Sequence, residues 1–150
     1  MVGIGYDSHR FAAGRRLVLG GVEIEHDEGL SGHSDADVLT HAVIDALLGA
    51  AGEGDIGTMF PAEDERWRDA DSIDLLRIVI GALPAAVENI DATLICERPR
   101  LGPYRPEMER ILAQATGARV SVKATSNEGM GWIGRGEGIA CVAVALLESE

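Results

Sequence analysis

Three apolar segments in the second half of the chain place the strongest constraint on its fold. Residues 90–96, 120–125 and 139–147 carry apolar side chains at both odd and even positions, as in the last segment, IACVAVALL. Successive side chains of a strand point to opposite faces, so these strands belong to a sheet that is buried on both faces. The sequence offers only about three helices, enough to cover one face. The second face therefore needs another cover, which further copies of the same chain could supply.

The remaining elements follow from helix-forming runs and from turn residues. We expect helices at residues 34–51, 71–83 and 106–115, with Ser34 as a candidate N-cap and glycine or proline after each end. We expect short strands at residues 2–6, 17–19 and 21–24, and a glycine-containing loop at residues 53–68. The pattern predicts a two-layer α+β or α/β sandwich in one domain, residues 1–150. Its mixed sheet would be mostly four-stranded, with helices on one face and a trimer contact on the other.

The charge of the chain argues against two classes of partner. The formal net charge is −12, and no cluster of Lys and Arg forms a basic stripe. We therefore do not expect the protein to bind a nucleic acid or an anionic membrane. An acidic protein can still bind phosphates through metal ions, backbone amides and a few basic residues.

The cysteines and the start of the chain bear on localisation. Cys96 and Cys141 lie far apart in apolar runs, which predicts buried free thiols in a reducing compartment. The first residues lack the basic and apolar regions of a secretory leader, and no apolar run approaches membrane-spanning length. We therefore expect a cytoplasmic protein, or a protein of the plastid stroma if the source is a plant, although no transit peptide is present.

The segment GYDSHRF, residues 5–11, places a carboxylate and an imidazole two positions apart. In an extended segment residues i and i+2 point to the same face, so Asp7 and His9 would project side by side. The pair is half of a metal site, although a polar loop after an edge strand would account for the same residues. A third ligand would have to come from elsewhere in the chain.

The first expected helix carries a histidine on a narrow polar stripe. Asp37, His41 and Asp45 recur every four residues on a helix that is otherwise apolar, so they share one face. A solvent-exposed face is the alternative, although Lys or Glu would be more ordinary there than His. If His41 faces Asp7 and His9, the result is three protein ligands with an open fourth position, as for a Zn²⁺ that handles a substrate. Asp45, one turn further on, could then hold the imidazole of His41.

Two further segments could bind phosphate. His33 and Ser34 stand at the start of the expected helix, where free backbone N–H groups favour an anion, although simple N-capping by Ser34 is an alternative. The loop at residues 123–138 has the glycine spacing of a dinucleotide-binding turn, but a strand-like segment follows it, which excludes a Rossmann fingerprint.

The same loop carries polar side chains that suit a diphosphate. Thr125 and Ser126 offer hydroxyl groups, Glu128 a carboxylate and Arg135 a guanidinium. Such a set could bind a diphosphate bridged by Mg²⁺. A flexible hairpin connection is the alternative.

Several segments together resemble the 2-C-methyl-D-erythritol 2,4-cyclodiphosphate synthases of the non-mevalonate isoprenoid pathway. They are GYDSHRF, LGGVEI, GLSGHSDADVLTHAVIDALLGAAGEGDIGTMFP, DADSIDLLR and VKATSNEGMGWIGRGEGIACVAVALL, and they cover nearly the whole chain. The resemblance implies a phosphorus–oxygen lyase that converts 4-diphosphocytidyl-2-C-methyl-D-erythritol 2-phosphate into the cyclic diphosphate and CMP. It also implies a homotrimer with active sites between neighbouring subunits.

The resemblance assigns roles to individual residues. It implies one Zn²⁺ per chain on Asp7, His9 and His41, and a Mg²⁺ or Mn²⁺ that Glu128 holds with the substrate diphosphate. His33 and Ser126 would be the catalytic residues near the transition state. Substrate contacts are implied at Ser34 for phosphate, at Asp55, Gly57, Phe60, Pro61, Ala62, Glu63 and Asp64 for the erythritol end, at Cys96, Arg100, Leu101 and Gly102 for cytosine, and at Thr125 for the diphosphate. Trp132 and Arg135 would face the trimer axis, where an apolar channel can admit an isoprenoid diphosphate.

Two other kinds of protein fit some of these residues. One is a non-catalytic metal- or isoprenoid-binding trimer, and the other is a different metal-dependent phosphohydrolase that uses the same Asp-His-His set. Glu128 with Thr125 and Ser126 argues against the first, because a mere binder needs no second cation site. The missing acidic cluster of a two-metal centre argues against the second.

Overall fold

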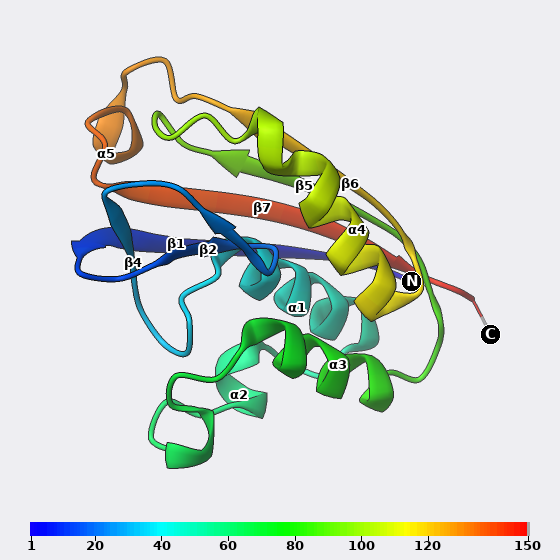
Figure 1. The fold of residues 1–150 in the computed structure, drawn as a ribbon. Coiled ribbons are helices and arrows are strands. Elements are labelled where there is room, and N and C mark those ends of the chain that lie inside the picture. The colour runs from blue at the N-terminus through cyan, green and yellow to red at the C-terminus, as the bar shows by residue number, and fades with distance from the viewer. Residues whose placement is uncertain (150) are drawn as a thin grey trace.

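A mixed sheet dominates the computed structural model, which describes residues 1–149 (Figure 1). Its strand order is β4-β1-β7-β5-β6, and only the β5–β6 pair is parallel. The strands are β1 (Val2–Ala13), β4 (Glu28–Ser31), β5 (Val87–Ile95), β6 (Arg119–Thr125) and β7 (Gly138–Leu147). A separate hairpin consists of β2 (Leu17–Leu19) and β3 (Val22–Ile24). The four expected strands of the sheet are thus extended by a fifth, β4, which has only four residues and no clear alternation.

Three helices pack together on one side of the sheet. They are α1 (Val38–Ala51), α3 (Ser72–Ala82) and α4 (Arg105–Thr116). The first packs on β1 and β7, the last packs on β6, and α3 packs on the other two helices (Figure 1). Single turns of helix lie at α2 (Ile56–Met59), η1 (Glu65–Trp67), η2 (Gly102–Tyr104) and α5 (Gly131–Gly134). None of the helices within residues 1–149 has the length and apolar character needed to cross a membrane.

The first helix starts later than the sequence predicts. Its N-cap is Asp37 rather than Ser34, and the segment before it is a turn in which Ser34 and Ala36 take left-handed φ angles of 54° and 56°. Two residues in this region of φ/ψ space interrupt the helical path, so the helix cannot begin at Ser34. Its other end, at Ala51 with Gly52 as the cap, is where we expected it.

Asp37 joins the start of α1 to the β2–β3 hairpin. Its buried carboxylate accepts hydrogen bonds from the Thr40 backbone N–H (3.0 Å), the Thr40 hydroxyl (2.8 Å) and the N–H groups of Gly20 and Gly21 (2.9 Å each). Burial and the charge of Asp35 raise the pKa of Asp37, and the backbone hydrogen bonds lower it by less. Asp37 is therefore directed at the hairpin, and it does not share a functional stripe with His41.

The strand β1 is longer than expected, and it carries glycine where α1 crosses it. It continues past residue 6 to Ala13, so Asp7 and His9 lie inside a strand, and the alternative of a polar loop is wrong. A Cβ atom on Gly5 would overlap the Ala42 carbonyl oxygen and stand 2.7 Å from the Ala46 nitrogen. The helix backbone thus lies directly on the strand, on the face that also carries Asp7 and His9.

The other face of β1 and β7 is apolar and exposed. Its side chains are Val2, Ile4, Tyr6, Val144 and Leu146, which are exposed by 69, 70, 55, 39 and 38%. They form one surface, because Val2 pairs with Leu146 and Ile4 with Val144 across the two strands. We call these five residues the outer apolar strip. An apolar surface of this kind commonly marks a contact with another protein chain.

The contact between α1 and β1 can be tested with a pair of glycine variants. Gly5→Ala should destabilise the protein by about 2–3 kcal/mol, because its methyl group has no space against the helix backbone. Gly49→Ala is the matched control: Gly49 is exposed within α1, its added Cβ would meet only the Ile4 carbonyl oxygen at 3.8 Å, and the change should be neutral or stabilising by up to about 1 kcal/mol. Urea unfolding measures both, and equal midpoints for the two variants would contradict the proposed close packing.

Candidate functional site

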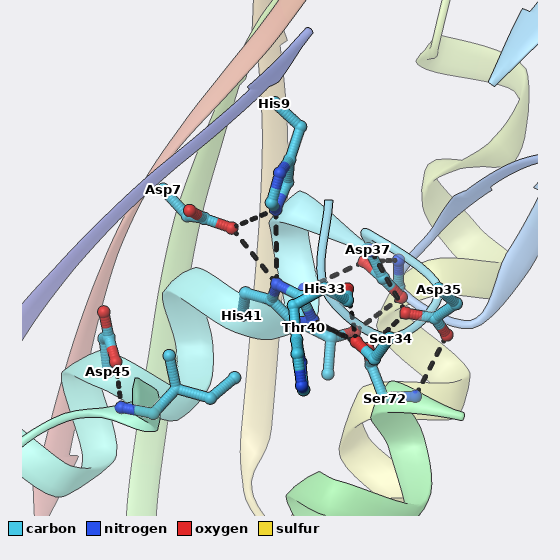
Figure 2. Close-up of polar contacts among 12 residues, drawn as sticks. Asp7, His9, His33, Ser34, Asp35, Asp37, Thr40, His41, Asp45 and Ser72 are labelled. Carbon is cyan, nitrogen blue, oxygen red and sulfur yellow. Dashed lines mark hydrogen bonds and ion pairs between the residues drawn. The ribbon is translucent and has the colours of Figure 1, made fainter. Parts of the chain in front are cut away.

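The three expected ligands meet where β1 passes the start of α1 (Figure 2). The Oδ2 atom of Asp7 lies 2.7 Å from His9 Nε2 and 3.2 Å from His41 Nδ1, and the two nitrogens are 3.3 Å apart. Donor atoms of all three side chains lie within 4.8 Å of one another. His41 is buried, whereas Asp7 and His9 are partly exposed, so the cluster is accessible from outside.

The chemistry of this cluster fits a divalent metal ion. One carboxylate oxygen and two imidazole nitrogens form a donor set that suits Zn²⁺ and similar ions, and three ligands leave a coordination position open. Burial raises the pKa of Asp7, but its contacts with His41 and His9 lower it by more, to about 2. Burial lowers the pKa of His41, and the contact with Asp7 raises it by more. The surroundings thus favour positive charge beside an ionised Asp7, which a bound cation would supply.

The geometry of His9 depends on a neighbouring glycine. Gly32 lies against the imidazole ring, and a Cβ atom there would stand 2.6 Å from His9 Cε1. Only glycine leaves room for the ring in this position. The edge of the His9 ring then meets His41 at an interplanar angle of 74°, with the ring centroids 5.4 Å apart.

The structure corrects the role predicted for Asp45. Its Oδ1 atom accepts a hydrogen bond from the Ile56 backbone N–H (2.8 Å), and no hydrogen bond joins it to His41 within residues 1–149 (Figure 2). Burial raises the pKa of Asp45, and the Ile56 hydrogen bond lowers it by less. Asp45 therefore anchors the start of α2 beside α1, one helical turn beyond His41, and does not hold the imidazole.

The structure also changes the interpretation of Ser34. Its side chain is buried, and its hydroxyl donates a hydrogen bond to the His33 carbonyl (2.7 Å) and lies 3.0 Å from His41 Nε2 (Figure 2). The hydroxyl is thus directed at the imidazole rather than outward. His33 is partly exposed, and its buried Nε2 atom has no hydrogen-bond partner among residues 1–149.

A second site lies at the ends of β5 and β6. A cavity of about 630 Å³ opens between the segment after β5 and the end of β6. It is lined by six of the predicted substrate or catalytic residues, Cys96, Arg100, Leu101, Gly102, Thr125 and Ser126. Residues about 25 positions apart in the sequence therefore meet at one cavity. None of Asp7, His9 and His41 lines this cavity.

The cysteines behave as expected from their apolar surroundings. Cys96 and Cys141 are both buried and free. Burial raises the pKa of Cys96 to about 11, although the Sγ–H group also donates a hydrogen bond to the Arg98 carbonyl (2.9 Å). Neither thiol has the character of a nucleophile.

Glu97 connects the two segments that form this cavity. Its Oε1 atom accepts hydrogen bonds from the backbone N–H groups of Asn127 (2.7 Å) and Gly129 (3.3 Å). These residues flank Glu128, which is exposed and takes a left-handed φ of 54°. Glu97 thus fixes the loop that presents the Glu128 carboxylate. Nothing local in the sequence indicates this contact, because Glu97 and Asn127 lie 30 positions apart.

The residues expected around the erythritol end lie in and after α2. The Asp55 side chain caps that helix by accepting from the Thr58 N–H (2.8 Å), and Gly57 lies within it. Phe60 is buried and meets the Trp67 ring edge-to-face, with the centroids 4.9 Å apart. Pro61, Ala62, Glu63 and Asp64 follow in a partly exposed segment.

Trp132 and Arg135 belong to the segment around α5. Trp132 lines a cavity of about 210 Å³ together with His9, Ser8, Arg10 and Glu137. Arg135 is exposed, and its Nε atom pairs with the Glu137 carboxylate (2.8 Å). The structure thus brings Trp132, but not Arg135, to a cavity that borders the metal cluster.

Comparison with known proteins gives one consistent result. Residues 1–148 match the model of the YgbB family. The chain is 56% identical to a 2-C-methyl-D-erythritol 2,4-cyclodiphosphate synthase from Symbiobacterium thermophilum, over 98% of both chains. It is 59% identical to one from Rubrobacter xylanophilus, over 98% of this chain and 94% of the relative. A solved structure of such a synthase in its CDP-bound form matches with a TM-score of 0.89 at 36% identity, covering 99% of this chain and 100% of the other.

The metal cluster can be tested with two aspartate variants. Asp7→Asn should lose most of the bound divalent metal, because a neutral amide is a far poorer ligand than the carboxylate. Asp45→Asn should keep the metal, since its remaining oxygen can still accept the Ile56 N–H and no hydrogen bond joins this side chain to His41 within residues 1–149. Elemental analysis of both purified proteins measures this. Undiminished metal in Asp7→Asn, or its loss in Asp45→Asn, would contradict the geometry above.

Proposed function

The chain belongs to the YgbB family of 2-C-methyl-D-erythritol 2,4-cyclodiphosphate synthases, lyases of isoprenoid biosynthesis, and we propose that Asp7, His9 and His41 hold the Zn²⁺ ion of this enzyme. The observation that carries the proposal is the meeting of these three side chains from two separate elements. The reaction converts 4-diphosphocytidyl-2-C-methyl-D-erythritol 2-phosphate into the 2,4-cyclodiphosphate and CMP.

The reaction needs no nucleophile from the protein. An oxygen of the substrate's own 2-phosphate forms a bond to the β-phosphorus, and the bond between that phosphorus and the oxygen bridging to the α-phosphate breaks. CMP leaves with the electron pair of the broken bond. Such a transfer depends on positioning and on neutralising charge. A Zn²⁺ ion held by Asp7, His9 and His41 would supply a Lewis acid for a phosphate oxygen.

The remaining residues would position the substrate and stabilise the transition state. His33 and Ser126 would donate hydrogen bonds to the phosphoryl oxygens as charge develops on them. Thr125 would bind the diphosphate, and the cavity of Cys96 and residues 100–102 would hold the cytosine. This assignment is supported by the size of that cavity and by the CDP-bound form of the related synthase.

Glu128 would hold a second cation, Mg²⁺ or Mn²⁺, with the substrate diphosphate. A carboxylate oxygen is a suitable ligand for such hard ions, which usually reach a protein through one or two carboxylates and substrate phosphates. The exposed position of Glu128, on the loop that Glu97 fixes beside the cytosine cavity, supports this role.

The active enzyme would be a homotrimer that associates through the outer apolar strip. The five exposed side chains of that strip would be buried in the contact, which accounts for apolar residues on both faces of the sheet. The separation of the cytosine cavity from the metal ligands within one chain supports an active site shared by two neighbours. Trp132 and Arg135 of each copy would then lie near the axis and could bind an isoprenoid diphosphate.

The activity itself has a direct test. The purified protein should carry about one zinc per chain and should convert the diphosphocytidyl substrate into cyclic diphosphate and CMP, followed by phosphorus NMR. His41→Ala should lose the zinc and at least about 100-fold in turnover, because the metal supplies several kcal/mol of charge stabilisation. A fully zinc-loaded protein that forms no cyclic product would contradict the proposal.

The second cation can be separated from the first by mutation. Glu128→Gln should leave the zinc content intact and raise the Mg²⁺ concentration for half-maximal turnover by about tenfold, because an amide binds Mg²⁺ more weakly than a carboxylate. Glu88→Gln, at an exposed glutamate of β5, is the matched control and should change neither quantity. An unchanged Mg²⁺ dependence in Glu128→Gln would remove this residue from the role.

The trimer can be tested with two lysine substitutions. The 15.9 kDa chain should scatter light as a trimer, and Ile4→Lys should dissociate it, because a charge cannot be buried in an apolar contact without a large penalty. Ile78→Lys is the matched control, since Ile78 is 44% exposed on α3, away from the strip. A stable monomer that is active at nanomolar concentration would refute the trimer and the shared active site.

A further inference from the structure

The far side of the His41 ring meets two hydroxyl groups. While Nδ1 faces Asp7 and His9, Nε2 lies 2.9 Å from Ser72 Oγ and 3.0 Å from Ser34 Oγ (Figure 2). Ser72 is the first residue of α3, so the ligand-bearing helix α1 is linked to a second helix through the ring of His41. All three side chains are buried, with exposed fractions of 0% for Ser72 and 4% for Ser34 and His41.

Both hydroxyl groups donate their protons to acceptors other than His41. Ser72 Oγ–H donates to the Asp35 carboxylate, and Ser34 Oγ–H donates to the His33 carbonyl at 2.7 Å. A carbonyl and an ionised carboxylate can only accept hydrogen bonds, and each hydroxyl has a single proton. With its proton on Asp35, the Ser72 oxygen can only accept from His41, and the Ser34 oxygen can do the same while its proton lies on the His33 carbonyl. This arrangement places a proton on Nε2 of the imidazole.

The Asp35 carboxylate is itself fixed by the backbone. Its Oδ2 atom accepts from the Ser72 N–H (2.9 Å) and its Oδ1 atom accepts from the Asp37 N–H (3.1 Å). These bonds come from two different elements, the start of α3 and the turn before α1, and they hold the carboxylate against the Ser72 hydroxyl. The donor and the acceptor of each hydrogen bond between Asp35 and Ser72, and between Ser72 and His41, are therefore defined.

We propose that Ser72, oriented by Asp35, is a positioning residue that keeps neutral His41 in its Nε2–H tautomer and so reserves the Nδ1 lone pair for the metal ion. The proposal rests on the metal-binding role of His41 proposed above. A neutral imidazole carries one proton, and with that proton on Nδ1 the ring would turn an N–H group toward the metal position. Partners of this kind commonly change metal affinity by 10- to 100-fold.

The tautomer can be measured without metal, substrate or mutation of the network. Long-range ¹H–¹⁵N correlation NMR of the metal-free, histidine-labelled protein, at a pH where the ring is neutral, reports which nitrogen carries the proton. The signals of His41 are assigned by their loss in His41→Asn. Protonated Nε2 is expected even though the Asp7 carboxylate, whose Oδ2 atom lies 3.2 Å from Nδ1, competes for a proton on that side of the ring. Protonated Nδ1 would overturn the proposal even if every variant failed to fold.

Zinc affinity tests the consequence. Competition with a chromophoric chelator should show Zn²⁺ binding weakened about 10- to 100-fold in Ser72→Ala, whose backbone N–H still anchors Asp35. Ser121→Ala, at an exposed serine of β6, is the matched control and should stay within twofold. An affinity within twofold in folded Ser72→Ala would overturn the proposal. Failure of the proposed function would give a different result. The protein would bind zinc and show the Nε2–H tautomer of His41, but it would form no cyclic product.

Discussion

The backbone contact between α1 and β1 is the constraint on which the rest of the structure depends. Gly3 and Gly5 remove the side chains that would hold the helix away, so its carbonyl groups rest on the strand. The next two residues on the same face of the strand are Asp7 and His9, and the helix carries His41 at the matching level. A helix packed on ordinary side chains would lie farther from the sheet, and no movement of single side chains would restore the cluster. The fold and the candidate metal site thus share one cause.

The sequence predicts those parts of this arrangement that follow from the repeat of side-chain directions along a strand or a helix. A period of two places Asp7 beside His9, and the helical period places His41 on the inner face of α1. The sequence underestimates the length of β1, because Asp7, Ala12 and Ala13 have low intrinsic strand propensity, and pairing with β7 and β4 keeps this segment extended. The start of α1 was misjudged because Ser34 and Asp37 are both good N-caps, and the hairpin glycines that select Asp37 lie 16 and 17 positions away.

Side-chain partners were predictable only where they are local in sequence. Asp45 occupies the position expected of a His41 partner on a helix, but the α2 backbone takes it instead. The residue that meets the far nitrogen of His41 is Ser72, 31 positions away on another helix. Nothing in the sequence around Ser72 distinguishes it from an ordinary first-turn serine. The candidate metal ligands could thus be inferred from periodicity, whereas the groups that orient them depend on how the helices pack on one another.

Glu97 has a consequence for the motion of the molecule. One carboxylate oxygen of Glu97 accepts from two backbone amides of the loop at residues 126–130, while the Glu97 backbone lies in the segment that lines the 630 Å³ cavity. Neither segment can open without breaking bonds to the other, so the two form a single cooperative unit. The amides of Asn127 and Gly129 would therefore exchange with solvent deuterium at rates that depend on the segment after β5 on the other side of the cavity. A ligand bound there would slow their exchange without touching them.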